Sequence, residues 1–301
     1  METCCILYNP KAGNGRGLNE ARRLDSIWSG KSLDYIDVTT IADIRAYLDS
    51  LPADTTVVLA GGDGTLNHFI NDMDGEAPAR DIYYFAAGSG NDFLRDAERT
   101  RDDPPFLLNP YLQNLPTVTV NGMTRYFLNG IGYGIDGYCC EVGDKQRLKS
   151  DKPVNYTAIA IKGLLFGYHR TLADVCVDGD TKAYRAVWLA PTMKGRFYGG
   201  GMMCAPGQNR LDPEGSVSTM VMTGKSKLKT LIVFPSIFKG GHIRHREMVT
   251  IRPGHEVTVR FNRPTALQID GETVLGVTEY SVSTRRSVGA AEKSEAAVVA
   301  E

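Results

Sequence analysis

A cluster of glycines around one aspartate is the clearest candidate for chemistry in this sequence. Gly61, Gly62 and Gly64 surround Asp63 directly after an apolar stretch rich in β-branched residues. Thr65 can cap the helical pattern that follows, so backbone amides and the positive end of a helix would meet there, which suits a phosphate. Asp63 is compatible with phosphate if a divalent cation lies between them. We therefore favour a nucleotide-phosphate site over a simple Asp-Gly turn.

Two further glycine loops follow predicted strands. Residues 9–13 come after the first strand, and residues 88–93 come after the fourth. Because the carboxyl ends of parallel strands line one edge of a sheet, all three loops should face a shared ligand. None of them is a Walker A loop, and the spacing of Gly13, Gly15 and Gly17 does not fit a dinucleotide fingerprint.

The elements that position these loops alternate along the first 95 residues. Apolar strand-like runs cover residues 3–8, 33–38, 55–60 and 82–87, and helical patterns cover residues 18–28, 41–51 and 66–73. Repeated strand, glycine loop and helix predicts a parallel sheet with helices on both faces. The fold expected here is an α/β nucleotide-binding domain.

The pattern changes after about residue 115. Asn121-Gly122 is a hairpin signal, and one long helix is plausible over residues 154–168. The other predicted elements are short strands at residues 173–177, 184–190, 216–222, 247–251, 256–261, 266–269 and 280–283. We expect domains at residues 1–120 and 121–284, the second an antiparallel β-rich sandwich or barrel. Residues 285–301 lose periodicity and are expected to be a tail that frays or packs back on the first domain.

Composition is that of an ordinary globular protein. The 301 residues carry a net charge of −1, with 42% hydrophobic and 23% charged residues. These values exclude a disordered chain, a collagen-like fibre and a polybasic nucleic-acid binder. The six cysteines include no C-x-x-C, and no apolar run reaches the 18 or so residues that span a membrane. The beginning of the chain has no signal-peptide pattern, so a reduced, cytoplasmic protein is expected.

Charge is nevertheless unevenly distributed. Residues 193–263 hold 12 lysines and arginines against four acidic residues, a local net charge of +8. Within this stretch, Lys225, Lys227 and Lys229 precede the apolar run 231–234. Basic and large apolar residues together suit an anionic membrane surface, although a solvated protein face is the ordinary alternative. Nucleic acid is not expected as a partner, because phosphate grooves rarely need such an apolar run.

Taken together, the motifs resemble the diacylglycerol kinase catalytic domain family, which includes bacterial soluble lipid kinases, sphingosine kinases and ceramide kinases. The resemblance rests on Asn9-Pro10, on residues 61–65, on the Gly-Ser-Gly-Asn-Asp-Phe run at 88–93, on residues 129–134, on Ala205-Pro206 and on residues 268–272. NAD kinases and phosphofructokinases, which share the fold of the first domain, carry elements similar to residues 61–65. The run at 88–93 and the Asp-Gly-Glu run at 270–272 therefore distinguish the lipid kinases from those two families.

The resemblance implies a role for each matching residue. ATP is the implied co-substrate, with Asp63 engaging Mg²⁺, and Glu272 is the implied proton acceptor with Asp270 beside it. The last two roles could be exchanged, and spacing alone would favour an ordinary turn at Asp270-Gly271. The implied nucleotide pocket comprises Asn9, Thr40 (or Thr39), Gly61, Gly62, Asp63, Gly64, Thr65, Asn67, Gly88, Ser89, Asn91 and Asp92.

A structural Mg²⁺ loop is also implied, near residues 208–216. Relatives usually show Asp-Asp-Gly where this chain has Asp212-Pro213-Glu214-Gly215. Glu214 and the carbonyls of Leu211 and Ser216 are the best candidate ligands, and a simple turn is an equal alternative.

Three functions are consistent with the sequence. The first is an ATP- and Mg²⁺-dependent kinase of a lipid hydroxyl, diacylglycerol-like, acting in an interdomain cleft while peripherally associated with a membrane. The second is a kinase of a soluble acceptor such as NAD, and the third is a non-catalytic nucleotide- or lipid-binding protein. The identity of the lipid is open, and an exposed strand edge could pair two copies into a homodimer.

Overall fold

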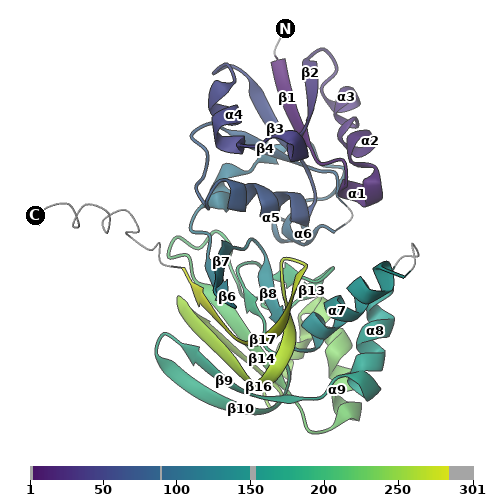
Figure 1. Ribbon diagram of the computed structural model, residues 1–301, viewed down its shortest axis with the longest axis vertical. Coiled ribbons are helices and arrows are strands. Elements are labelled where there is room, and N and C mark those ends of the chain that lie inside the picture. Colours follow the sequence, from purple (N-terminus) through teal and green to yellow (C-terminus); the bar gives the residue numbers. More distant parts are fainter. Residues whose placement is uncertain (1–2, 89, 150–153, 285–301) are drawn as a thin grey trace, which may run out of the picture.

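The computed structural model describes residues 3–88, 90–149 and 154–284, which form two parts with a sheet each (Figure 1). The first sheet has the strand order β2-β1-β3-β4-β5. Its strands are β1 (Thr3–Tyr8), β2 (Ser32–Asp37), β3 (Thr56–Gly61), β4 (Ile82–Ala86) and β5 (Phe106–Leu107). Strands β1 to β4 run parallel, and β5 pairs antiparallel with β4. The predicted parallel sheet is confirmed.

Helices cover both faces of this sheet because alternate strand residues point to opposite sides. One apolar core joins Ile6 of β1 to Leu24, and the other joins Leu7 to Leu48 and Leu66. The helices are α1 (Ala12–Gly15), α2 (Gly17–Ala21), α3 (Leu24–Ile27), α4 (Ile44–Ser50), α5 (Asp63–Asp72) and α6 (Asp92–Asp96), with 3₁₀ turns η1 (Val38–Thr40) and η2 (Asn109–Leu112).

Two helix predictions need correction. The single helix expected over residues 18–28 is divided into α2 and α3. The helix expected over residues 66–73 is α5, which begins three residues earlier, at Asp63. Asp63 is therefore the first residue of a helix, where a carboxylate interacts favourably with the helix dipole.

The second sheet is antiparallel and closes on itself. Its strands are β6 (Thr117–Val120), β7 (Met123–Tyr126), β8 (Gly130–Tyr133), β9 (Thr171–Val177), β10 (Asp180–Leu189), β11 (Thr192–Met193), β14 (Val217–Thr223), β15 (Val249–Gly254), β16 (Glu256–Ile269) and β17 (Glu272–Ser283). Because β9 pairs with both β10 and β16, the strands β16-β8-β11-β14-β10-β9 form a ring. Its core includes Tyr133 stacked on Phe261 at 3.8 Å between ring centroids. The predicted antiparallel β-rich part is confirmed.

Helices flank the right-hand side of this ring (Figure 1). They are α7 (Ile135–Arg147), α8 (Tyr156–Lys162), the π-helical turn η3 (Gly163–Gly167), α9 (Lys227–Val233) and the 3₁₀ turns η4 (Phe234–Lys239) and η5 (Gly241–Arg244). A further hairpin pairs β12 (Phe197–Tyr198) with β13 (Met202–Met203).

The sequence did not predict α7 or α9. Gly137 and Gly143 weaken the helical pattern of α7, yet a Cβ on Gly137 would lie only 2.0 Å from the carbonyl oxygen of Ala266. Glycine is required there because α7 packs directly against the backbone of β16. The helix expected over residues 154–168 is present as α8 and η3.

Strand lengths also differ from the prediction. The strands expected at residues 256–261 and 266–269 are one long strand, β16, and the strand expected at residues 280–283 is the end of β17. β6 ends at Val120 and β7 begins at Met123, and both strands belong to the second sheet. A domain boundary at residue 120 stays a prediction. Residues 285–301, where the tail was expected, lie outside the described residues. Within the described ranges, no helix combines the length and apolar character needed to cross a bilayer.

Candidate active site

The glycine loops after β1, β3 and β4 meet at the carboxyl edge of the first sheet. The Asn9 side-chain amide donates to the Thr65 hydroxyl at 3.1 Å, which joins the first loop to α5. The backbone amides of Ala87 and Gly88 donate to the Gly61 carbonyl at 2.9 and 3.0 Å. Three segments that are distant in sequence therefore form one continuous surface.

Close backbone packing explains why glycines occupy this edge. A Cβ on Gly88 would lie 2.3 Å from the Gly62 Cα, and a Cβ on Gly61 would lie 2.4 Å from the Thr65 side chain. Contacts below 3 Å do not occur for real Cβ atoms, so a side chain here would separate the loops. The glycines hold the backbone amides close to any ligand at the start of α5.

Asp63 and Asp92 form an acidic pair within this surface. The Asp63 carboxylate accepts from the amides of Asp92 at 2.9 Å and Phe93 at 3.1 Å. Asp92 in turn accepts from the amide of Gly200 at 2.8 Å, across to the second part of the molecule. Burial, together with the charge of Asp63, raises the pKa of Asp92 to about 6, and burial also raises the pKa of Asp63.

The acidic pair offers oxygen atoms that suit a hard cation. Asp92 Oδ1 and Asn91 Oδ1 are buried and have no hydrogen-bond partner among the described residues. Mg²⁺ prefers carboxylate and amide oxygens, and its charge would remove the repulsion between Asp63 and Asp92. The residues present therefore fit a divalent cation.

Asp270 links the two parts of the molecule. Its carboxylate accepts from the amides of Leu128 at 2.5 Å and of Asn129 and Gly130 at 2.9 Å each. It also accepts from the side-chain amide of Asn67 in α5 at 2.8 Å. With four donors bound, the lone-pair sites of this carboxylate are occupied.

Glu272 differs from Asp270 in its surroundings. It is the first residue of β17, and its side chain is 42% exposed. One carboxylate oxygen accepts from Arg125 Nη1 at 2.5 Å, and the other lies 3.6 Å from His68 Nε2. The guanidinium of Arg125 also donates to Asn67 Oδ1. Neither Arg125 nor His68 can be identified from the sequence, because no motif connects them to the residues they contact.

The structure says less about the remaining residues that were predicted to bind the nucleotide. Thr40 ends η1, is exposed, and donates through its hydroxyl to the Asp37 carbonyl at 2.8 Å. It follows β2 and so lies at the same edge of the sheet as the glycine loops. Gly64 is exposed in the first turn of α5. Ser89 lies outside the described residues.

The predicted metal loop is held by its own side chains. The Asp212 carboxylate accepts from the amides of Glu214 and Ser216, each at 3.1 Å, and from the Ser216 hydroxyl. Gln208 donates to the Ser216 carbonyl at 2.8 Å, while Leu211 and Glu214 are exposed. Within residues 3–88, 90–149 and 154–284, no cluster of three or more His, Cys, Asp or Glu is placed to hold a metal. A site at Leu211, Glu214 and Ser216 stays a prediction.

Buried charges at the junction of the two parts were not foreseen. Asp96 of α6 pairs with Arg196 Nε at 2.7 Å and with Arg210, whose Nη2 donates to Asn129 Oδ1 at 2.8 Å. Nearby, Lys194 is 1% exposed, and its ammonium has no hydrogen-bond partner among the described residues. Burial lowers the pKa of Lys194 to about 8.

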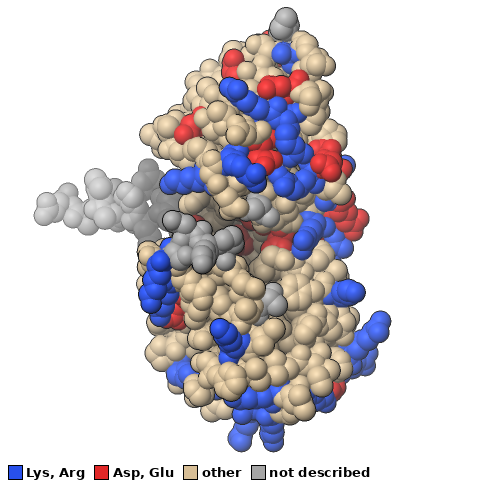
Figure 2. Space-filling view, turned by 90° about the vertical axis from the view of Figure 1, so that its right-hand side faces the viewer, with Lys and Arg blue, Asp and Glu red and all other residues tan. Residues whose placement is uncertain are grey.

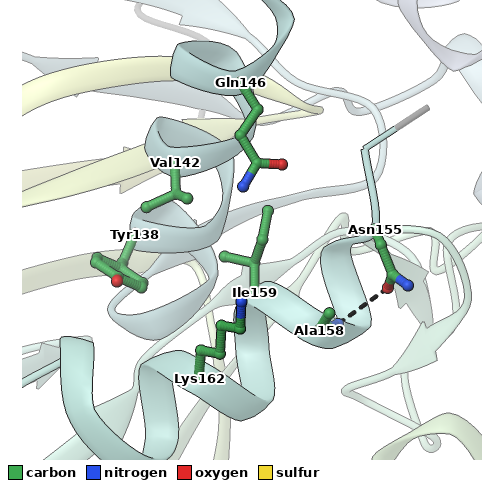
Figure 3. A pocket seen from close by; sticks show the side chains of 7 residues that line it. All are labelled: Tyr138, Val142, Gln146, Asn155, Ala158, Ile159 and Lys162. Carbon is green, nitrogen blue, oxygen red and sulfur yellow. Dashed lines mark hydrogen bonds between the residues drawn. The ribbon is translucent and has the colours of Figure 1, made fainter. Parts of the chain in front are cut away.

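Two hollows flank α7. The hollow of about 280 Å³ between α7 and α8 is drawn in Figure 3, where its lining residues come from the two helices. A second, of about 270 Å³, lies between α7, η3, β16 and β17, and Tyr138 lines both hollows. Thr273, next to Glu272, donates to Asp144 of α7 at 2.7 Å. The helix that lines both hollows is thus attached beside the candidate base.

Comparison with known proteins gives consistent results. The sequence model of the diacylglycerol kinase catalytic domain matches residues 3–120, and that of the YegS C-terminal NAD kinase beta sandwich-like domain matches residues 129–285. A diacylglycerol kinase of Mycobacterium tuberculosis (strain ATCC 25618 / H37Rv) is 24% identical over 257 residues, covering 82% of this chain and 81% of that protein. A candidate lipid kinase of Bacillus subtilis (strain 168), YtlR, is 22% identical over 317 residues, covering 94% and 96%. The crystal structure of a diacylglycerol kinase from Bacillus anthracis str. Sterne has a TM-score of 0.62 at 16% identity, covering 94% and 93%, and supports the same fold.

Proposed function

The chain belongs to the diacylglycerol kinase family, and on that premise we propose that it transfers the γ-phosphoryl group of ATP to the hydroxyl of a diacylglycerol-like lipid. The observation that carries this proposal is the meeting of two sets of residues. Asn67 lies in α5, the helix that begins within the proposed phosphate loop at residues 61–65. It contacts both Asp270 and Arg125, and Arg125 contacts Glu272. The proposed phosphate site and a partly exposed carboxylate are therefore linked by a short series of side-chain hydrogen bonds.

On the nucleotide side, the start of α5 and the glycine loops provide amides for the phosphates of ATP. Asp63, with Asp92 and Asn91 beside it, would hold Mg²⁺. Magnesium supplies charge neutralisation for the phosphates when it is bound. The buried, unpartnered oxygens of Asp92 and Asn91 support this assignment.

On the acceptor side, we assign proton removal to Glu272 and positioning to Asp270. Glu272 is partly exposed, and one of its carboxylate oxygens lies 3.6 Å from His68 Nε2. Asp270 is occupied by four hydrogen-bond donors, which suits a residue that fixes the cleft. A general base must reach the proton it removes, and Glu272 has more freedom to do so.

A lipid acceptor is supported by the mainly apolar hollow between α7 and α8. The hollow in Figure 3 is lined by Val142 and Ile159 with the ring of Tyr138 at one end. This hollow has room for part of an acyl chain, and the hydrogen bond between Thr273 and Asp144 holds α7 against the strand that carries Glu272.

An anionic membrane surface is the proposed partner. Large apolar side chains are exposed on η3 and α9, with exposed fractions of 79% for Phe166, 70% for Leu228 and 71% for Ile232. Lys227 and Lys229 lie beside them on α9. Figure 2 shows that the lower half of this face is mostly uncharged, with basic side chains gathered at its lower end.

Vesicle sedimentation tests the membrane proposal. The chain should bind vesicles containing phosphatidylglycerol more tightly than vesicles of phosphatidylcholine alone, by about 1 kcal/mol for each lysine near the headgroups. Leu228→Glu with Ile232→Glu should abolish binding, whereas Ile27→Glu on α3 should leave it unchanged. Equal binding by both variants would refute this surface.

The acceptor is tested with purified chain, Mg²⁺ and γ-labelled ATP. Label should enter detergent-dispersed diacylglycerol and should not enter NAD. Transfer to NAD alone would favour the soluble-acceptor alternative, and transfer to neither would favour a binding protein without catalysis.

A further inference from the structure

Arg125 occupies a position between the two halves of the proposed site. It lies on β7, and its side chain is only 17% exposed. One nitrogen of its guanidinium, Nη1, is 2.5 Å from the Glu272 carboxylate, and Nη2 donates to Asn67 Oδ1. The guanidinium therefore joins three segments that are far apart in the chain.

The contacts of Asn67 set the direction in which Arg125 points. The Asn67 amide nitrogen donates to Asp270, so its oxygen must face the opposite side, where Arg125 lies. Asn67 is four residues after Asp63, one turn along α5 and on the same face. The guanidinium thus lies between the helix that begins at the phosphate loop and the carboxylate assigned as base.

We propose that Arg125 is a catalytic residue, one that pairs with Glu272 in the structure and contacts the transferring phosphoryl group once ATP is bound. This inference rests on the proposed function. It adds a positively charged side chain from the second part of the molecule to a nucleotide site that the first part builds. It also explains how a base that is paired with arginine becomes free at the moment when its acceptor arrives.

The chemistry of the step requires a cation at this point. The oxygen of the acceptor hydroxyl forms a bond to the γ-phosphorus, while the bond from that phosphorus to the oxygen bridging the β- and γ-phosphates breaks. ADP leaves with the electron pair of the broken bond, and Glu272 takes the hydroxyl proton. Negative charge spreads over the outer oxygens of the moving group, and an arginine stabilises such charge strongly.

Arginine suits both states because its planar guanidinium presents several donors. Two of them serve Glu272 and Asn67 in the structure, and the same geometry fits two oxygens of a phosphoryl group. Lysine could supply the charge but not the two parallel hydrogen bonds.

Steady-state kinetics of Arg125→Ala tests the inference. We expect kcat to fall about 1,000-fold, within the range known for arginines that contact a transferring phosphoryl group, with KM for ATP changed by less than about 3-fold. Arg125→Lys should lose less, about 100-fold. Guanidinium ion at millimolar concentration, well below denaturing levels, should restore part of the activity of Arg125→Ala.

A matched control is available on the same sheet. Arg260 pairs with Glu279 between β16 and β17, with both side chains exposed and 2.6 Å between Arg260 Nε and Glu279 Oε2. Arg260→Ala should keep wild-type kcat, and thermal melting should show that Arg125→Lys is folded.

Three results would overturn the inference. They are near wild-type kcat in Arg125→Ala, a loss of activity without any rescue by guanidinium, or a loss that appears wholly in KM. If Glu272→Gln is inactive while Arg125→Ala is active, only the inference about Arg125 fails. A wild-type chain that phosphorylates no acceptor would contradict both this inference and the proposed function.

Discussion

The proposed nucleotide side and the proposed acceptor side of the site are built in different ways. On the nucleotide side, short glycine loops pack backbone against backbone. They pack so closely that a Cβ added to Gly88 would lie only 2.3 Å from the Gly62 Cα. On the acceptor side, Arg125, Asp270 and Glu272 are joined by side-chain hydrogen bonds across large sequence distances. The first side depends on the absence of side chains, and the second depends on particular side chains. Substitutions should therefore fail in different ways on the two sides.

The largest effect is expected at Asp63 on the nucleotide side. Asp63→Asn removes the charge that would hold the cation, so turnover should fall by about 1,000-fold or more and Mg²⁺-dependent ATP binding should weaken. Isothermal titration with a non-hydrolysable ATP analogue measures the binding, and Asp72→Asn, at the exposed end of α5, is the control. Unchanged ATP affinity in the presence of Mg²⁺ would contradict a cation at Asp63.

On the acceptor side, Asp270→Ala should lower the stability of the fold. It leaves the amides of Leu128, Asn129 and Gly130 without an acceptor, at a cost of about 3 kcal/mol in the free energy of unfolding. Urea unfolding measures this cost. Asp74→Ala is the control, since Asp74 also has a positive φ but is exposed. Equal stabilities for the two variants would show that Asp270 does not fasten the parts together.

Lys194, at the junction of the two parts, makes the stability of the fold depend on pH. Its folded pKa of about 8 lies below the ordinary 10.5, so the unfolded chain binds more protons between these values and stability should rise with pH across them. The stabilising contribution is complete above the unfolded value and is lost as pH falls through the folded value. Lys194→Met should gain about 3 kcal/mol at pH 7 and lack this rise. Urea midpoints at pH 7 and pH 10 check it, and parallel curves for the two proteins would argue against a buried charge.

A smaller effect is expected from Gly88→Ala on the nucleotide side. The added methyl group would press on Gly62 and separate the loops after β3 and β4, so KM for ATP should rise about 10-fold, with a smaller change in stability. Gly207→Ala, where a Cβ meets nothing within 4 Å, is the matched control. If the two variants have the same KM, close loop packing is not what organises the phosphate site.

The same difference explains what could be predicted from sequence. Residues 61–65 and 88–93 are local runs, so their place after strands and their convergence at one sheet edge followed from the pattern of strands and glycines. Arg125 and the cluster of Asp96 with Arg210 have no local signature, because their partners lie about 60 to 150 residues away.

Helix α7 was missed for a related reason. Its glycines look like helix breakers in the sequence, and only the backbone of β16 against Gly137 shows why they are needed. Spacing alone also could not separate the roles of Asp270 and Glu272. The structure distinguishes them by their surroundings, since Asp270 holds four donors and Glu272 remains partly exposed.

The central claim is that the two sides meet to transfer phosphate to a lipid hydroxyl, with Glu272 as the base. Comparison of wild type with Glu272→Gln tests it most directly, by measuring ATP affinity and labelled phosphate transfer to diacylglycerol on the same preparations. We predict unchanged ATP affinity with transfer reduced by about 100- to 10,000-fold, because the base is lost while the nucleotide loops are intact. Transfer at the wild-type rate in Glu272→Gln would contradict the account.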